Sequence, residues 1–240
     1  MPRLEQLLAR NTHYTRAEAR QLLRSGAVSS GSGAAIDERL EPTELPITVR
    51  VHKREIVLHD TSHVLLNKPL GCVTALRDAQ HPVAFDYLVG AALKDELRPV
   101  GRLDLDTSGL LLWTTDGQWL QRLSHPKRKV PRTYHAALTQ PFLPMPEGFT
   151  LADGHKPHIT ELREMDVSSA HPSLARPDGG RLFASITITG GAYHEVRRIF
   201  AALGSHVAAL CRVSFGNLVL PDDLAPGAHR PFRPEDVLSE

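Results

Sequence analysis

The chain has 240 residues, of which 41% are hydrophobic and 23% are charged, a balance typical of a globular protein with one large or two unequal domains. No apolar run approaches the roughly 20 residues that a membrane-spanning helix needs, and residues 1–11 lack the apolar stretch of a signal peptide, so we expect a cytoplasmic protein without a membrane partner. The net charge of +1, from 28 Lys and Arg against 27 Asp and Glu, does not by itself indicate a nucleic-acid-binding protein, for which the distribution of charge matters more than its sum.

The first segment is expected to form a small helical module. The leucines within residues 4–8 recur at helical spacing. Thr15 to Glu18 has the form of a capping box, in which the Thr and Glu side chains each accept a hydrogen bond from a free amide at the start of a helix. Leu22 and Leu23 give this second helix an apolar side, and Gly26 is a good terminator.

Three arginines, Arg16, Arg20 and Arg24, fall on one stripe of the second helix, four residues apart. Like charges at this spacing repel by about 0.2–0.5 kcal/mol per pair. Phosphate groups of a nucleic acid would neutralise this repulsion, so we expect the stripe to bind phosphates. A merely solvated helix face is the alternative.

Residues 29–35 are expected to be a flexible turn or linker, and residues 47–51 alternate like a strand. A domain boundary is expected shortly before the buried strand that starts at Val64. The boundary separates an N-terminal module, residues 1–60, from a larger domain, residues 61–240.

The larger domain mixes strands and helices without regular alternation, which predicts an α+β fold with a mostly antiparallel mixed sheet. Apolar residues from Val196 onwards recur at i, i+3, i+4 and i+7, so residues 192–203 are expected to form an amphipathic helix. The Pro-rich residues 140–181 are expected to be loops. Residues 109–115 predict a central strand that ends at a turn formed by Asp116 and Gly117. The other expected strands are residues 64–67, 133–138, 182–189 and 206–215.

A second basic zone lies between Gly117 and Pro146, where five basic residues occur without any Asp or Glu. Such a run is usually a solvated face, and nucleic-acid phosphates are the alternative partner. The five residues are Arg122, Lys127, Arg128, Lys129 and Arg132.

Asp104 and Asp106 are the first candidates for chemistry. Two carboxylates two residues apart on a strand point to the same side, so they could bind a metal ion or act as an acid/base pair. A turn that leads into the next strand is the structural alternative. The two cysteines, Cys72 and Cys211, are expected to be reduced and buried, and no Cys-x-x-Cys or His-Glu-x-x-His pattern predicts a zinc site.

Several motifs follow one another in the larger domain. In chain order they are Leu66–Gly71 (Leu-Asn-Lys-Pro-Leu-Gly), Gly101–Asp104 (Gly-Arg-Leu-Asp) with Asp106–Leu112 and Thr115–Gly117, Arg132–Tyr134 (Arg-Thr-Tyr) and Gly191–Arg198. In order and spacing, from about residue 64 to the C-terminus, they resemble the RNA pseudouridine synthases. The resemblance is stronger to the bacterial branch that modifies single uridines of ribosomal RNA.

The resemblance implies that a uridine is isomerised to pseudouridine without a cofactor or a metal ion. It implies that Asp104 is the nucleophile, that Arg197 pairs with Asp104, and that Tyr134 lies against the base with its hydroxyl placed for proton removal at C5. Whether Asp104 attacks C1′ of the ribose or C6 of the uracil stays open. Glu195 stands where relatives usually have Gln, although its side chain and that of Arg197 point to different helix faces. Lys68 and Pro69 are expected to be structural, because Pro fixes the turn after the strand.

Further cations are expected to contact the RNA. In the second basic zone, phosphate binding now outweighs the solvated face because the zone directly precedes Tyr134. Arg102 is expected to fill the space left by the base or to contact phosphate. The expected RNA-binding residues are Arg102, Arg16, Arg20, Arg24, Lys127, Arg128, Lys129, Arg132 and Arg198.

The N-terminal module resembles a small RNA-binding domain shared with a ribosomal small-subunit protein, although Val28-Ser-Ser-Gly-Ser-Gly replaces the usual Val-x-Val-Asn-Gly hairpin. Residues 116–119, Tyr193 with His194, and residues 224–227 look most like the small-subunit (16S) rRNA enzymes, the RsuA type. The expected partner is therefore small-subunit rRNA or a partly assembled small subunit, bound by a monomer. The alternatives are a large-subunit (23S) rRNA enzyme, a non-catalytic RNA-binding assembly factor on the same fold, and a metal-dependent transferase or hydrolase.

Overall fold

The computed structural model describes residues 2–31, 33–34, 36, 40, 42, 44–177 and 182–238. The chain divides into two compact units, one of Met1–Ser62 with Gly90–Leu97 and one of His63–Val89 with Arg98–Glu240. The predicted boundary lies after residue 60, and the predicted larger domain includes Gly90–Leu97, a short segment that groups with the first unit in the structure.

Two helices open the first unit, as predicted. They are α1 (Leu4–Asn11) and α2 (Arg16–Arg24). The capping box is present at α2, because Thr15 Oγ1 accepts from the Glu18 amide at 3.3 Å and the Glu18 carboxylate accepts from the Thr15 amide at 2.7 Å. Gly26, at φ 70°, takes the left-handed conformation that ends many helices.

A three-stranded antiparallel sheet completes the first unit, which is therefore not only helical. Its strands are β1 (Val28–Ser30), β2 (Ile47–Val51) and β3 (Arg54–Leu58), in the order β1-β2-β3. β2 has the predicted bounds. β1 occupies the start of residues 29–35, which were expected to be a linker, because its backbone pairs with β2 although its side chains carry no strand pattern. Part of that segment lies outside the described residues.

The strand β3 was not predicted, and the turn before it explains why. His52 and Lys53 join β2 to β3, with φ angles of 47° and 70°. A two-residue hairpin turn with two positive φ angles normally carries Asn or Gly. His and Lys at these positions therefore gave no turn signal in the sequence.

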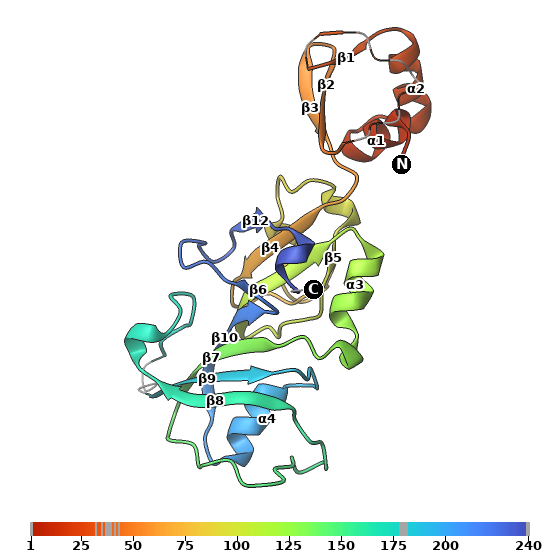
Figure 1. Ribbon diagram of the computed structural model, residues 1–240. Helices are drawn as coiled ribbons and strands as arrows, with labels where there is room; N and C mark the ends of the chain where they lie inside the picture. The colour runs from red at the N-terminus through yellow and green to blue at the C-terminus, as the bar shows by residue number, and fades with distance from the viewer. Residues whose placement is uncertain are drawn as a thin grey trace. The chain divides into compact units, whose positions relative to one another are not determined.

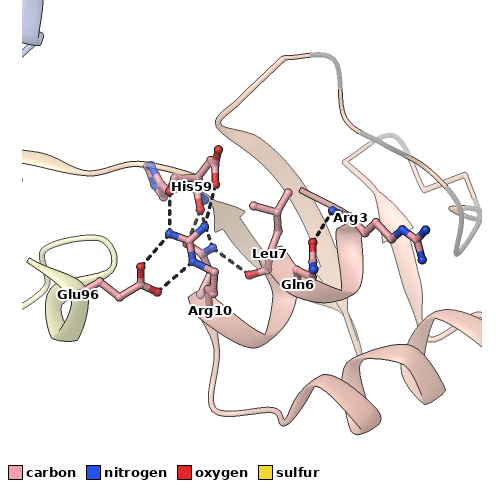
Figure 2. A network of polar contacts seen from close by, with 8 residues as sticks. Arg3, Gln6, Leu7, Arg10, His59 and Glu96 are labelled. Atoms are coloured by element: carbon pink, nitrogen blue, oxygen red, sulfur yellow. Dashed lines mark hydrogen bonds and ion pairs between the residues drawn. The ribbon is translucent and has the colours of Figure 1, made fainter. Parts of the chain in front are cut away.

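Arg10 holds the segment Gly90–Leu97 in the first unit (Figure 2). Its guanidinium donates to Asp60 Oδ1 at 2.7 Å and to the Asp60 carbonyl at 2.8 Å. It also donates to both carboxylate oxygens of Glu96, at 3.0 and 2.8 Å. Beside it, the Asn11 side chain bonds to the backbone amide and carbonyl of His59. Because a bidentate Arg–carboxylate pair fixes geometry as well as charge, Arg10 has a structural role.

The second unit is built on one nine-stranded sheet, which confirms the predicted α+β fold. The strand order is β12-β4-β6-β10-β7-β9-β8, with β5 on β6 and β11 on β10 (Figure 1). β6 lies inside the sheet, as predicted, and pairs in parallel with β10, whereas the other described pairs of this sheet are antiparallel. The strands are β4 (His63–Lys68), β5 (Arg98–Pro99), β6 (Thr107–Thr114), β7 (Arg132–Leu138), β8 (Ile159–Met165), β9 (Leu182–Ile188), β10 (Val207–Phe215), β11 (Leu218–Val219) and β12 (His229–Pro231).

Several elements of the second unit were not predicted, among them the short strands β5, β11 and β12. β8 lies inside residues 140–181, which were expected to be loops. It is an edge strand whose pairing with β9 shifts register near its start, so its apolar residues do not alternate. The helix α3 (Gly117–Ser124) begins where only a turn was expected, because the Asp116 side chain accepts hydrogen bonds from the amides of Gln118 and Trp119.

The helix α4 (Glu195–Ala202) confirms the amphipathic helix predicted within residues 192–203. It begins later than expected because His194, at φ 47°, interrupts the helical backbone. The short 3-10 helices of the chain are η1 (Ala84–Tyr87), η2 (Lys94–Glu96), η3 (Pro126–Arg128), η4 (Val167–Ser169) and η5 (Pro234–Asp236).

Both cysteines are free and buried, as predicted. Cys211 lies in β10 within the apolar core of the second unit, together with Leu110 and Leu112 of β6. Burial raises the pKa of the Cys211 thiol to about 11, so the thiol stays protonated and packs as a small apolar group.

His135 in β7 makes the stability of the second unit depend on pH. Its Nδ1 accepts a hydrogen bond from the His171 amide at 3.1 Å. Burial, and then the neighbouring His171, lower the pKa of His135 from 6.5 to about 4. The unfolded chain therefore takes up this proton at a higher pH than the folded protein does, so we expect the free energy of unfolding to fall as the pH drops from 6.5 towards 4.

Denaturant unfolding at several pH values in this range measures the effect. The variant His135→Asn keeps an acceptor near the position of Nδ1 and cannot titrate. Its stability should decline less steeply with acidification than that of the wild type. Equal slopes in the two proteins would show that other groups carry the pH dependence.

Candidate active site

A pocket of about 860 Å³ opens in the second unit. It is lined by the loop before β6, by strands β7 and β10, by residues 155–158 and by the segment that leads into α4. Asp104, Tyr134 and Arg197 all line this pocket, although they come from three separate elements. The three residues to which the resemblance assigned catalysis are thus neighbours in space.

A buried ammonium group donates hydrogen bonds to the backbone that carries Asp104 and holds it in place. Lys68, at the end of β4, is fully buried, and its Nζ donates to the carbonyl oxygens of Asp104 at 3.0 Å, Thr107 at 2.8 Å and Pro69 at 3.0 Å. Burial lowers the pKa of this ammonium below its usual value. These contacts bear out the structural role expected of Lys68, while the Asp104 side chain stays 41% exposed.

Replacing Lys68 by Met should therefore cost about 3 kcal/mol in the free energy of unfolding. The variant fills a similar volume but leaves three buried carbonyl oxygens without their donor. Chemical denaturation measures the loss, and Lys127→Met, a change at an exposed lysine, is the control that should stay within about 0.5 kcal/mol of the wild type. Equal stability of the two variants would contradict the anchoring role.

Arg197 does not form the expected ion pair with Asp104. Its Nη2 lies 2.8 Å from Asp106 Oδ2, and its guanidinium donates to the carbonyl oxygens of Asp106 and Val207, both at 3.1 Å. Nη2 of Arg197 thus contacts both a carboxylate oxygen and the backbone carbonyl oxygen of Asp106. These two contacts fix the loop beside Asp104. Asp104 itself faces His194, whose Nε2 lies 3.6 Å from Asp104 Oδ2.

Tyr134 is buried in β7 and lies directly opposite Arg212 of β10 in the strand register. Arg212 is 1% exposed, and its Nε donates to a backbone carbonyl of β6 at 2.7 Å. Arg132 donates to the Gly190 carbonyl, and its guanidinium lies 4.9 Å from the centre of the Phe215 ring. Burial lowers the pKa of Arg132. Arg132, which was expected to bind RNA, forms part of the pocket wall.

The carboxylate of Glu195 is buried and engaged by other groups. Its Oε1 lies 2.8 Å from His155 Nε2, and its Oε2 accepts from the Ala192 amide at 3.0 Å. Both oxygens therefore lie in contacts away from Arg197, which agrees with the prediction that the two side chains point to different helix faces. His155 comes from the Pro-rich stretch, 40 residues before Glu195, and no pattern in the sequence pointed to it.

Exposed cations surround the mouth of the pocket. Arg102 and Lys129, which were expected to bind RNA, line the pocket and are exposed. Lys156 lines it too and was not singled out from the sequence. Lys127 and Arg128 are exposed on η3, outside the pocket lining.

Protein carboxylates face three of the arginines that were expected to bind RNA. Arg198 Nη2 lies 2.5 Å from Asp153 Oδ2. Arg16 and Arg20 lie 3.5 and 3.6 Å from Oε1 of Glu5, whose side chain is only 5% exposed. The buried carboxylate relieves part of the repulsion along this stripe, so the stripe does not require phosphate to explain it. Its guanidinium groups nevertheless remain exposed.

In the part of the chain that the structure describes, no helix combines the length and apolar character needed to cross a membrane. Over the same residues, no group of three or more His, Cys, Asp or Glu side chains is arranged to hold a metal ion. Asp104 and Asp106 point to different partners and form no such group.

The chain is similar to known proteins over most of its length. A family model described as RNA pseudouridylate synthase matches residues 62–202. Ribosomal small subunit pseudouridine synthase A of Vibrio cholerae is 34% identical over 242 residues, which cover 99% of this chain and 98% of the relative. The protein of the same name from Escherichia coli strain K12 is 38% identical over 183 residues, covering 75% and 74%. A solved crystal structure of a pseudouridylate synthase superposes with a TM-score of 0.60 at 29% identity, covering 99% and 98% of the two chains.

The family match and the pocket lie in the same part of the chain. The matched residues contain the loop of Asp104, the strand of Tyr134 and the helix of Arg197. The relative from Vibrio cholerae extends the similarity over nearly the whole chain. The chain therefore belongs to the RNA pseudouridine synthases, isomerases that convert uridine in RNA to pseudouridine.

Proposed function

We propose that this enzyme isomerises one uridine of small-subunit ribosomal RNA, with Asp104 as its nucleophile. The observation that carries the proposal is the pocket, in which a partly exposed carboxylate, a buried Tyr134 and an ordered Arg197 lie together. Exposed Arg102 and Lys129 give its mouth a positive charge that suits RNA phosphates. The names of the Vibrio and Escherichia relatives support the small subunit as the source of the RNA.

The reaction moves a single bond of the target nucleotide. The glycosidic bond from N1 to C1′ breaks, the base turns, and C5 bonds to C1′. The C5 proton leaves and N1 gains a proton, so the composition of the nucleotide does not change. Asp104 supplies the carboxylate that bonds to C1′ or C6 while the base turns. The uridine must first leave its stack, at a cost of a few kcal/mol.

The neighbouring residues have separate roles in this proposal. Tyr134 lies against the uracil ring, with its hydroxyl at the place where the C5 proton is removed. Arg197 acts through Asp106, because its contacts hold the loop that presents Asp104. A loop fixed in this way keeps the nucleophile oriented while the base turns, which lowers the entropic part of the barrier.

The first unit is proposed to bind RNA through the exposed stripe of Arg16, Arg20 and Arg24 on α2. The stripe is already partly neutralised by Glu5, so its contribution to affinity should be modest. Each phosphate contact that is lost should lower the slope of the logarithm of affinity against the logarithm of salt concentration by about one.

The test is an assay of the purified enzyme on full-length transcripts of small-subunit and large-subunit rRNA, followed by mapping of pseudouridines. Conversion of one uridine in the small-subunit transcript, unaffected by EDTA, is the expected result. Conversion only in the large-subunit transcript would overturn the choice of RNA. Binding of both transcripts without any product, also with partly assembled subunits, would point to a non-catalytic assembly factor. Mapping rRNA from cells that lack this protein identifies the target in vivo.

A further inference from the structure

An exposed aromatic ring stands at the rim of the pocket. Tyr193 lines the pocket and is 77% exposed, more than any other large apolar side chain that the structure describes. One face of its ring stacks on the imidazole of His194, with 3.9 Å between ring centroids and 16° between the ring planes. The high exposure leaves the opposite face of Tyr193 open to solvent.

The backbone of residues 190–193, which carries this ring, is held by hydrogen bonds to three other side chains. Arg132 donates to the Gly190 carbonyl, the Ala192 amide donates to Glu195, and Arg198 donates to the Tyr193 carbonyl at 3.4 Å. His194 follows in a left-handed conformation, which residues other than glycine adopt only rarely. These contacts hold a segment whose most exposed large side chain, Tyr193, points to solvent.

The close packing around Glu195 shows how tightly this segment is held. A Cβ added at Gly190 would lie 2.5 Å from Glu195 Oε2, so the segment passes directly over the buried carboxylate. The carboxylate in turn contacts His155 on the other wall of the pocket. The ring of Tyr193 therefore projects from a backbone segment that is fixed by hydrogen bonds.

The charges and the aromatic surface around the ring suit a nucleotide of single-stranded RNA. The exposed cations at the pocket mouth, Arg102, Lys129 and Lys156, match a phosphate backbone. A uridine that turns into the pocket leaves its two neighbouring bases without one stacking partner each. An open aromatic face beside phosphate-binding cations is the surface on which single-stranded bases stack.

We propose that Tyr193 stacks on a nucleobase next to the target uridine and that His194 supports the ring from behind. This inference rests on the proposed RNA modification and adds a binding residue outside the reacting centre. The contact replaces the stacking that the neighbouring base loses when the uridine leaves the helix. Because a flanking base does not react, the contact stabilises the bound substrate and the transition state equally.

The variant Tyr193→Ala should raise KM for the small-subunit rRNA transcript by about tenfold, which is the usual loss when a stacking aromatic is truncated. Its kcat should stay within about twofold of the wild type. Tyr193→Phe keeps the ring and should restore KM. Tyr87→Ala, which removes an exposed tyrosine outside the pocket lining, should change neither constant.

The salt dependence of RNA binding separates stacking from phosphate contacts. In titrations of the same transcript, Tyr193→Ala should weaken binding without changing the slope against salt concentration, whereas Lys129→Ala should lower that slope by about one. Unchanged RNA affinity of Tyr193→Ala would overturn the proposal, as would a fall in kcat with an unchanged KM, which indicates a structural role. These titrations need no turnover, so absence of product with the wild type would count against the proposed function and not against the stacking contact.

Discussion

Replacing Asp104 by Asn is expected to abolish pseudouridine formation, with a loss in kcat on the order of 10⁴-fold or more. The amide has the size of the carboxylate but is not a nucleophile. The backbone contacts of Asp104 with Lys68 involve only the carbonyl oxygen, so they should persist in the variant. RNA affinity and the free energy of unfolding should therefore remain close to those of the wild type. Digestion of the treated transcript to nucleosides and chromatography measures the product.

Asp106→Asn is the matched control, because the same change is made two residues away. Asp106 pairs with Arg197 and also offers it a backbone carbonyl oxygen, which the variant keeps. We expect a loss of about tenfold in kcat, because the loop is held less firmly. Turnover by Asp104→Asn together with an inactive Asp106→Asn would assign the nucleophile to Asp106. Inhibition of the wild type by EDTA would support the alternative in which Asp104 and Asp106 bind a metal ion.

The sequence predicted the elements whose signals are local. The capping box at Thr15, the strand β2 and the amphipathic part of α4 depend on residues close together in the chain, and the structure confirms each of them. The resemblance implied that Asp104 and Tyr134 act on the same base, whereas spacing along the chain alone left Asp104 and Asp106 equivalent.

The sequence could not predict contacts that depend on the path of distant loops. Arg197 contacts Asp106 and the Val207 carbonyl oxygen and not the Asp104 side chain, an arrangement that depends on how the fold brings these separate segments together. The pair of Glu195 with His155 joins two segments that carry no common pattern. The strand β8 was missed for a related reason, since an edge strand with a register shift lacks the alternation that marks a strand.

Gly109 shows how a motif residue can be required by packing and not by chemistry. It lies in β6 opposite Arg212 of the parallel strand β10, with φ at 104°. A Cβ at this position would lie 2.3 Å from the carbonyl oxygen and 2.8 Å from the nitrogen of Arg212, and 2.8 Å from the sulfur of Cys211. Backbone atoms of a central strand cannot move aside without breaking the β6–β10 ladder.

Gly109→Ala is therefore expected to destabilise the protein by roughly 4 kcal/mol or more, from the backbone clash together with the positive φ angle. Denaturant unfolding of the purified variant, or its failure to accumulate as folded protein, measures the effect. Gly117→Ala is the control: Gly117 begins α3 and a Cβ there would meet nothing within 4 Å, so stability should be unchanged or slightly higher. A Gly109→Ala variant as stable as Gly117→Ala, yet inactive, would instead assign this glycine to the chemistry of the site.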